Sequence, residues 1–218
     1  MRSVWRYVRT RGIRHSLERF VSGYVAGAER WVLFYNDLDG PSAPGAHGEI
    51  TFRPYEPRDA ESLAVFAPRM RPAQFLAWVD DGSFVHLAFH GARPVGYRIV
   101  STRGPHGPLS EVVRLRPDEV WVVDLYTVPE YRGRGIGGCL GTHMDRHVAA
   151  AGYRGMYSTN LMTNPAAIRT SLKQGDQFRA LVTYRRLLFR RTLTVSTEIG
   201  EVLAAVQLTA PPPPPSAA

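Results

Sequence analysis

The sequence contains very little cysteine and almost no lysine. Cys139 is its one cysteine, which excludes an intrachain disulfide and favours a reducing, cytoplasmic compartment. Lys173 is its one lysine, so 26 of the 27 basic residues are arginine. No stretch approaches the roughly 20 consecutive apolar residues that cross a bilayer, so a transmembrane helix is not expected. The first ten residues lack the apolar segment of a secretory signal, so none is expected either.

The composition is that of an ordinary globular protein with a basic surface. The chain has 218 residues, of which 44% are hydrophobic and 21% are charged, and its formal net charge is +8. This length favours one domain with extensions. A basic surface attracts phosphates, anionic cofactors, nucleic acids or acidic lipids without choosing among them. Arginine favours bidentate contacts with phosphate, although codon usage in a GC-rich genome would enrich arginine equally.

Residues 1–48 form an N-terminal extension in this interpretation. Val4, Val8, Leu17 and Val21 recur at helical spacing with arginines between them, which predicts a basic, partly amphipathic helix over residues 1–28. A strand is expected at residues 31–35. The helix has three readings: it docks on its own domain, it joins a second subunit as a homodimer, or it contacts an anionic membrane surface or another partner. The expected location is cytoplasmic, either free or peripheral at the membrane.

The regular pattern of the main domain runs through residues 49–195. Residues 196–209 form a C-terminal segment with helical character, and the polyproline stretch in 210–218 predicts a disordered tail. Strands are expected at 50–55, 83–90, 94–101, 120–128 and 156–161, with one or two more within 178–194, and helices are expected at 58–67, 72–79, 136–151 and 165–174. Because strands alternate with helices only in the second half, the fold is predicted as mixed α/β.

The segment that carries the chemistry is a glycine-rich turn between a strong strand and a helix, at residues 128–138. Gly133, Gly135, Gly137 and Gly138 remove side-chain bulk, so that backbone N–H groups can point into one concavity. The positive end of the helix dipole lies behind them, which makes the turn suited to a pyrophosphate. Arg132 and Arg134 add positive charge at its rim.

Three phosphate-binding patterns compete for this turn. Gly133, Gly135 and Gly138 fit the dinucleotide fingerprint, but the acidic residue wanted about 20 positions later is missing from residues 153–162. A Walker loop is excluded, because Lys173 is followed by glutamine. The third pattern is Arg-x-x-Gly-x-Gly, which Arg132, Gly135 and Gly137 meet.

On these residues the sequence resembles the GNAT N-acetyltransferase superfamily. The run LYTVPEYRGRGIGGCL is similar to the acyl-CoA motif of that family, and Asn164 to Ile168 followed by Gly175 is similar to its second motif. The resemblance covers about residues 50–190. It implies an α/β (α+β) fold with a mixed, mostly antiparallel sheet of six to seven strands, a V-shaped splay between two central parallel strands, and helices on both faces.

The resemblance also implies where acetyl-CoA would bind, as a cosubstrate and without a metal. Strand 120–128 would splay from strand 156–161 to form a slot for the pantetheine arm. The backbone of Tyr126, Thr127 and Val128 would bond that arm, and the Val128 N–H would hold the thioester oxygen. Asn164 would contact the pantetheine or a bridging water. The pyrophosphate would lie against the amides of Arg132, Gly133, Arg134, Gly135, Ile136, Gly137 and Gly138.

The expected reaction is direct attack of an amine on the thioester, through a tetrahedral intermediate stabilised by a backbone N–H. An ammonium acceptor must first lose a proton, and Asp124 is the candidate base because it lies mid-strand among apolar residues. The alternative for Asp124 is a structural salt bridge with one of the many arginines. Glu119 and Glu130 are weaker candidates, because both lie at strand ends.

Two positions depart from the family pattern. The family often carries a tyrosine seven residues after the motif asparagine, acting as general acid toward the leaving thiolate, and Ser171 stands there in this chain. Either Ser171 or a water would protonate the thiolate, or no group need do so, because a thiol of pKa about 8.5 leaves readily. Asp176 follows Gly175 where phenylalanine is usual.

The function expected from all of this is N-acetyl transfer from acetyl-CoA to a primary amine of a small molecule, peptide or protein. The alternative is a non-catalytic CoA-binding sensor or partner-binding module with the same fold, and nucleic acid is not an expected partner. His143 and His147 have a metal-like spacing, but no third ligand is evident. His86 and His90 are interpreted as core or strand-end residues, with the acceptor cleft as their alternative.

Overall fold

A computed structural model describes residues 26–40, 48–67, 69–187, 190–200 and 202 of the chain. The contacts divide it into two compact units, and each is described by itself. The larger unit, here called the main unit, comprises Phe34–Thr159 and Arg169–Phe178. The smaller unit comprises the described residues of Met1–Leu33, Asn160–Ile168 and Arg179–Ala218.

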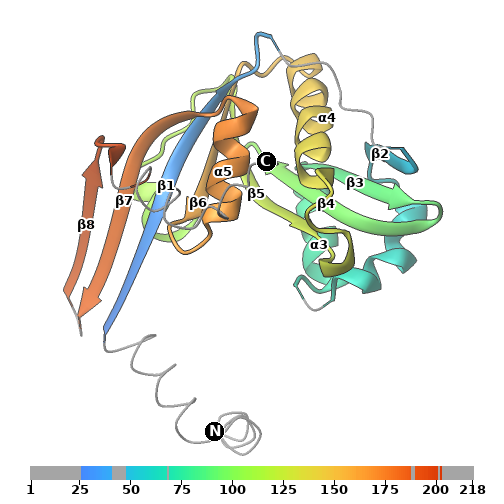
Figure 1. The fold of residues 1–218 in the computed structure, drawn as a ribbon, viewed down its shortest axis with the longest axis horizontal. Helices are drawn as coiled ribbons and strands as arrows, with labels where there is room; N and C mark the ends of the chain where they lie inside the picture. Colours follow the sequence, from blue (N-terminus) through green and yellow to red (C-terminus); the bar gives the residue numbers. More distant parts are fainter. Residues whose placement is uncertain (1–25, 41–47, 68, 188–189, 201, 203–218) are drawn as a thin grey trace, which may run out of the picture. The chain divides into compact units, whose positions relative to one another are not determined.

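The main unit is built on a mixed sheet in which the strand order is β2-β3-β4-β5-β6, followed by the end of β1 (Figure 1). These strands are β1 (Ala26–Asp37), β2 (Ile50–Pro54), β3 (Phe84–His90), β4 (Arg93–Ser101), β5 (Glu119–Thr127) and β6 (Gly155–Leu161). From β2 to β5 each neighbouring pair is antiparallel, and β5 and β6 are parallel. β3 and β4 are buried along nearly their whole length, as expected for central strands that are covered on both faces.

Helices cover both faces of this sheet. They are η2 (Pro57–Phe66), α3 (Pro72–Asp80), η3 (Gly107–Glu111), η4 (Pro129–Tyr131), α4 (Ile136–Ala150) and α5 (Pro165–Gln174). Side chains of β5 alternate between the faces. Tyr126 packs edge-on against Phe66 of η2, whereas Leu125 and Thr127 lie closest to Gly137 of α4. Therefore η2 and α4 lie on opposite sides of β5.

The core of the main unit consists of two buried apolar clusters. The larger joins η2, α3 and the sheet around the aromatic rings of Phe66, Phe75 and Tyr97. The second lies under the later turns of α4, where Met144 and Val148 are fully buried with strand residues such as Val120. In both clusters, apolar residues on one face of the strands pack against apolar residues that recur at helical spacing. Burial of these side chains stabilises the helices and the sheet together.

The smaller unit contains the first part of β1 with β7 (Gln177–Leu187) and β8 (Arg190–Ser196), in the order β1-β7-β8. β7 and β8 form an antiparallel hairpin. Trp31 of β1 and Tyr184 of β7 place their ring centroids 6.4 Å apart. The side chains of β8 are mostly exposed.

The predicted fold class is confirmed, and the described strands number eight where six to seven were expected within the domain. The strand expected at residues 31–35 is longer and belongs to the sheet as β1. The helix predicted over residues 1–28 is wrong at its end, because β1 begins at Ala26, and its remainder lies outside the described residues. Most of segment 196–209 and the whole polyproline tail also lie outside them. No helix among the described residues is long and apolar enough to span a membrane.

Candidate functional site

The main unit opens between its two parallel strands. β5 and β6 pair at three positions, the last of which joins Trp121 to Tyr157. β5 continues to Thr127, and within the described residues no pairing with β6 follows Trp121. Asp124 to Thr127 remain paired with β4, beyond a register shift at Ile99 and Val100, so this part of β5 has a described strand partner on its β4 side and none on its β6 side. This is the splay that the sequence predicts.

Immediately after β5 the chain makes the glycine-rich turn. Gly133 and Gly135 have φ angles of 75° and 79°, in the left-handed region that residues with a Cβ rarely adopt. A Cβ added at either position would meet nothing within 4 Å, so it is the backbone conformation that requires glycine here. Gly135 is also the N-cap of α4. The two glycines therefore let the chain reverse sharply and enter the helix.

The N-terminus of α4 carries amides that the helix itself does not satisfy. Its first internal bond runs from the Cys139 amide to the Gly135 carbonyl, at 3.1 Å. The amides of Ile136, Gly137 and Gly138 precede that bond, and Gly135 has no side chain with which to cap them. The first turn contains no acidic residue. Amides of this kind, backed by the helix dipole, favour an anion.

The arginines of the turn are held close to aromatic rings. The Arg132 guanidinium lies 5.4 Å from the centre of the Tyr126 ring, and its Nε donates to the Thr127 carbonyl at 3.0 Å. The Arg134 guanidinium lies 5.0 Å from the centre of the Tyr131 ring. The Arg132 amide itself donates to the Pro129 carbonyl at 3.2 Å, so it is engaged within the turn. The Arg132 amide is therefore occupied, contrary to its predicted place in the cradle.

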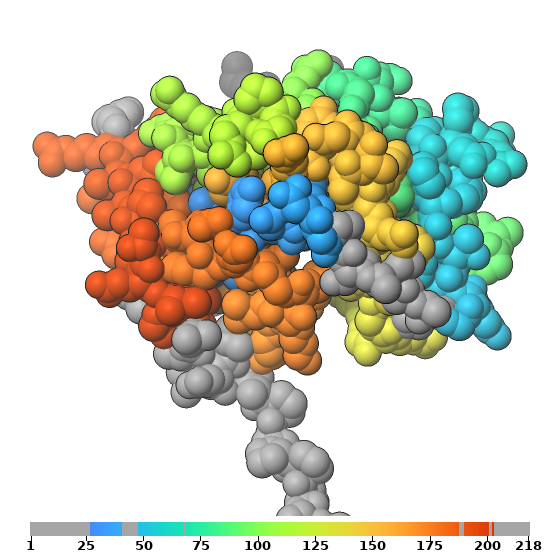
Figure 2. All heavy atoms as spheres, turned by 90° about the horizontal axis from the view of Figure 1, so that it is seen from above, coloured from blue at the N-terminus to red at the C-terminus, as the bar shows by residue number. Residues whose placement is uncertain are grey.

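A surface hollow of about 370 Å³ lies beside this helix end. His90 bridges two residues at its wall, with Nδ1 2.8 Å from the Tyr131 hydroxyl and Nε2 2.7 Å from Glu49 Oε2. In the space-filling view of Figure 2, the golden atoms of α4 border the cyan atoms of the segment that begins with β2. The lining residues are Gly48, Glu49, Ile50, His90, Tyr131, Arg134 and Ile136.

The Val128 amide donates to the Val95 carbonyl of β4, at 2.9 Å. It is therefore engaged in the sheet, and the prediction that it holds the thioester oxygen is wrong. In an antiparallel pair the backbone groups of successive residues point to opposite sides. With Val128 and Tyr126 bonded toward β4, the amide of Thr127 points toward the opened β6 side. In this part of β5 the Thr127 amide therefore faces away from β4, whereas the Val128 amide does not.

Asp124 accepts hydrogen bonds at both carboxylate oxygens. Arg69, from the segment between η2 and α3, donates through Nη2 to Oδ1 at 2.9 Å and through Nε to Oδ2 at 3.2 Å. The Tyr97 hydroxyl donates to Oδ2 at 2.7 Å. Burial, with the Asp124 charge as the second cause, raises the pKa of Tyr97, so this hydroxyl stays protonated. The same bonds raise the pKa of Arg69, and the salt-bridge alternative for Asp124 is present in the structure.

Ser171 is buried within α5, and its hydroxyl is hydrogen-bonded to the Asp176 carboxylate. Burial raises the pKa of Asp176, while the bond from Ser171 and the charge of Arg98 act in the opposite direction. The Asp176 amide also donates to the Ser171 carbonyl at 3.0 Å. The two departures from the family pattern are therefore paired with each other at the end of one helix.

Asn164 belongs to the smaller unit, where it precedes α5. Its Oδ1 accepts the Ala167 amide at 3.2 Å, and its carbonyl accepts the Ile168 amide at 3.3 Å. This is the geometry of a helix N-cap. The asparagine of the second motif thus caps α5.

Sequence reasoning missed the partners of the site residues. Arg69 and Tyr97 meet Asp124 from positions 55 and 27 residues away, and no local pattern announces such pairs. The ring nitrogens of the buried His86 and the half-buried His147 lie 2.6 Å apart, so His86 is the core residue that the first interpretation expected. Within the described ranges, no group of three or more His, Cys, Asp or Glu side chains is arranged to hold a metal ion.

The sequence matches the model of a known protein family. The sequence model described as the acetyltransferase (GNAT) family matches residues 49–175, which is more than half of the chain. The chain belongs to the GNAT acetyltransferase family. The match begins where the regular pattern of the sequence begins, and it contains β2 through α5, including the glycine-rich turn. No curated protein matches the chain.

Solved structures share the GNAT fold at low sequence identity. A GCN5-related N-acetyltransferase from Sphaerobacter thermophilus is 17% identical over 79% of this chain and 56% of its own, with a TM-score of 0.55. A GNAT-family acetyltransferase from Novosphingobium aromaticivorans is 20% identical over 76% of this chain and 64% of its own, with a TM-score of 0.52. The chain thus spans less than two thirds of either neighbour's length.

A third neighbour is one region of a larger enzyme. It is a GCN5-related glucosamine N-acetyltransferase region of a fungal multi-domain GH3 β-N-acetylglucosaminidase, 16% identical over 79% of this chain and 22% of its own, with a TM-score of 0.55. These three structures therefore share their fold with this chain.

Proposed function

We propose that this protein is an N-acetyltransferase that transfers an acetyl group from acetyl-CoA to a primary amine of a small molecule, peptide or protein. The observation that carries the proposal is the uncapped N-terminus of α4 beside the opened edge of β5. Amides of Ile136, Gly137 and Gly138 suit a pyrophosphate, because anions are stabilised at helix N-termini. The hollow lined by Arg134 gives room for further phosphate.

The same geometry supports the placement of the thioester. The pantetheine arm lies along the exposed side of β5 in this proposal, where the sheet has left backbone groups without a strand partner. The amide of Thr127 then points at the thioester oxygen and stabilises the charge that develops there during attack. The reaction gains chiefly from holding the amine and the thioester in line.

Asp124 takes the ammonium proton, directly or through a water, in this proposal. Its carboxylate is held in place by Tyr97, and its other partner, Arg69, has a side chain that is 56% exposed. An exposed guanidinium in an ion pair contributes little to stability, roughly 0–1 kcal/mol. A cationic acceptor can therefore replace Arg69 at Asp124, and the segment between η2 and α3 becomes part of the acceptor site.

The alternative of a CoA-binding sensor is supported by Ser171, whose hydroxyl is bonded to Asp176 where the family often has a tyrosine acid.

The test of the proposed function is release of the CoA thiol from acetyl-CoA in the presence of single amines: polyamines, glucosamine, and peptides with a free N-terminus. The proposal expects turnover with at least one amine class and an N-acetylated product by mass spectrometry. Acetyl-CoA binding without turnover across the panel would favour the sensor.

A further inference from the structure

The end of the β7–β8 hairpin concentrates positive charge. The last three cross-strand pairs join Arg185 to Thr192, Arg186 to Arg191, and Leu187 to Arg190. Four arginines therefore lie within three rungs at the end of this hairpin, which Figure 1 draws in orange and red. The hairpin end is therefore strongly basic.

The charge is not balanced by the hairpin's own sequence. From Gln177 to Thr197 the chain contains five arginines and no acidic residue. Arg185, Arg190 and Arg191 are exposed. Arginine forks onto phosphate oxygens, so the surface is complementary to a phosphate-bearing partner.

An apolar side chain is exposed within the same group. Leu187, opposite Arg190, is 61% exposed, the largest exposed fraction among the large hydrophobic residues that the structure describes as exposed. The sequence between Leu187 and Arg190 is Leu-Phe, which lies outside the described residues. A nucleic acid backbone offers no apolar layer for such a side chain, whereas a lipid head-group region offers phosphates above acyl chains.

We propose that the hairpin end, defined by the exposed residues Arg185, Leu187, Arg190 and Arg191, docks onto a membrane surface rich in anionic lipids. The arginines contact lipid phosphates, and Leu187 enters the boundary between head groups and acyl chains. This surface belongs to the smaller unit, whereas the glycine-rich turn belongs to the main unit. It would bring the enzyme to amines at a membrane.

The test is co-sedimentation of the full chain with vesicles of phosphatidylcholine containing 30% phosphatidylglycerol, against vesicles of phosphatidylcholine alone. The tip variant carries Arg190→Gln and Arg191→Gln. Its matched control carries Arg114→Gln and Arg146→Gln, which remove the same charge from two exposed sites of the main unit. Each arginine near such a surface strengthens binding roughly five-fold, so the tip variant should bind about 25-fold more weakly than its control.

A second variant, Leu187→Ser, separates the apolar contact from the charge. In 0.5 M salt, which screens the arginines, it should bind anionic vesicles several-fold more weakly than the unmodified chain.

Equal binding by the tip variant and its control would overturn the proposal and assign any membrane affinity to other parts of the chain. A tip variant that loses binding to single-stranded RNA but keeps its vesicle binding would also overturn it, in favour of a nucleic-acid surface. Thermal melts of all variants verify folding.

Discussion

At the scale of residues, Asp124 combines a fixed position with an exchangeable partner. The Tyr97 hydroxyl holds one carboxylate oxygen from within the core, where Tyr97 is fully buried. Arg69 reaches the carboxylate from the surface. In the proposed mechanism, this buried donor and exposed cation leave the carboxylate where an incoming ammonium would meet it. Its role as base and its role in an ion pair are therefore compatible in one site.

Replacing Asp124 with asparagine should lower kcat roughly 100-fold or more, because a positioned base contributes about 10²–10⁴ to such a step. The amide keeps the shape and accepts from Tyr97, so acetyl-CoA binding should remain. The rate of Asp124→Asn should continue to rise with pH toward the pKa of the amine, since only the neutral amine then reacts. Steady-state rates measured from pH 6 to 10 provide the comparison.

Arg69→Gln is the control for this prediction. If Arg69 competes with the acceptor for Asp124, its removal should lower KM for the amine and leave kcat nearly unchanged. A purely structural pair would behave differently. Both variants would then lower the melting temperature and leave kcat of the folded protein unchanged, which would remove Asp124 from the mechanism.

The pair of His86 and His147 predicts how stability depends on pH. Burial, with the neighbouring histidines as further causes, lowers the pKa of His86 to about 3, whereas an unfolded histidine has a pKa near 6.5. The unfolded chain therefore binds the extra proton below pH 6.5, and stability is lost as the pH falls through this range. The loss between pH 8 and pH 5 should be about 2 kcal/mol.

Urea unfolding at a series of pH values measures this slope. The difference between the unmodified chain and His86→Gln isolates the contribution of His86 from the carboxyls Asp145 and Asp176, whose pKa values burial raises. The same slope in both proteins would mean that His86 gains its proton without cost in the folded state.

Site residues were predictable from the sequence only where the chemistry is local. The glycines of the turn lie within six positions of one another, and their spacing alone indicates a cradle. The wrong role of Val128 has a different origin. Which amide faces the opened side depends on the register with β4, and a shift of one residue reverses the answer. No sequence pattern along β5 contains that register.

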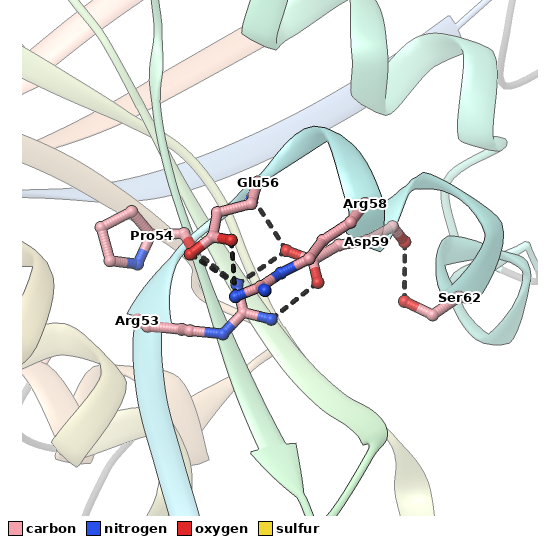
Figure 3. A network of polar contacts seen from close by, with 6 residues as sticks. All are labelled: Arg53, Pro54, Glu56, Arg58, Asp59 and Ser62. Carbon is pink, nitrogen blue, oxygen red and sulfur yellow. Dashed lines mark hydrogen bonds and ion pairs between the residues drawn. The ribbon is translucent and has the colours of Figure 1, made fainter.

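At the scale of elements, the connection from β2 to η2 is held by a buried carboxylate (Figure 3). Asp59 accepts both Nη groups of Arg53, at 2.7 and 2.8 Å, and also the Glu56 amide at 2.8 Å. The Arg53 bond lowers the pKa of Asp59 as its largest cause. Figure 3 shows these bonds joining the end of β2 to the first turn of η2, which fixes where the helix begins.

Asp59→Asn should destabilise the protein by about 2–3 kcal/mol, because it removes the nearest charge partner of the half-buried Arg53 guanidinium and leaves it only the more distant Glu56, at 3.7 Å, among the described residues. Chemical unfolding at neutral pH is the measurement. Arg58→Gln is the matched control, since its side chain is 73% exposed and pairs with Glu56 at the surface. Its effect should stay within about 0.5 kcal/mol. Equal effects of the two variants would show that the buried pair contributes no more than the exposed one.

Element boundaries followed closely from periodicity and punctuation. The helix predicted at 165–174 is α5 as observed, and the strand predicted at 120–128 is β5, shifted by one residue. Pro165 in the first turn of α5 and Gly175 directly after its last residue mark the limits of this helix locally. The segment at 57–66 forms tight 3₁₀ turns, which its sequence pattern did not predict. Its start is stabilised by the Arg53–Asp59 pair, a contact that the pattern of apolar residues does not contain.

At the scale of the whole molecule, ligand binding should stabilise the fold. The proposed acetyl-CoA site draws on β5, the turn and α4, which are elements of the main unit. A ligand that binds only the folded state at 100 times its Kd adds about 2.7 kcal/mol. The melting temperature should therefore rise by roughly 5–10 °C for a protein of this size. The rise in melting temperature is measured by thermal unfolding in three samples, which contain acetyl-CoA, adenosine diphosphate or neither ligand.

The smaller shift expected with adenosine diphosphate reports the pyrophosphate portion of the site alone. No shift with acetyl-CoA at millimolar concentration would contradict the assignment of the site.

The most direct test of the central claim is calorimetric titration of acetyl-CoA into Gly135→Asp and Gly135→Asn. Both residues tolerate the left-handed backbone better than other side chains and can cap α4, so the pair differs in one charge at the helix N-terminus. If the amides there bind the pyrophosphate, the aspartate should weaken acetyl-CoA binding at least ten-fold more than the asparagine does. Equal affinities for the two variants would place the diphosphate elsewhere and contradict the account.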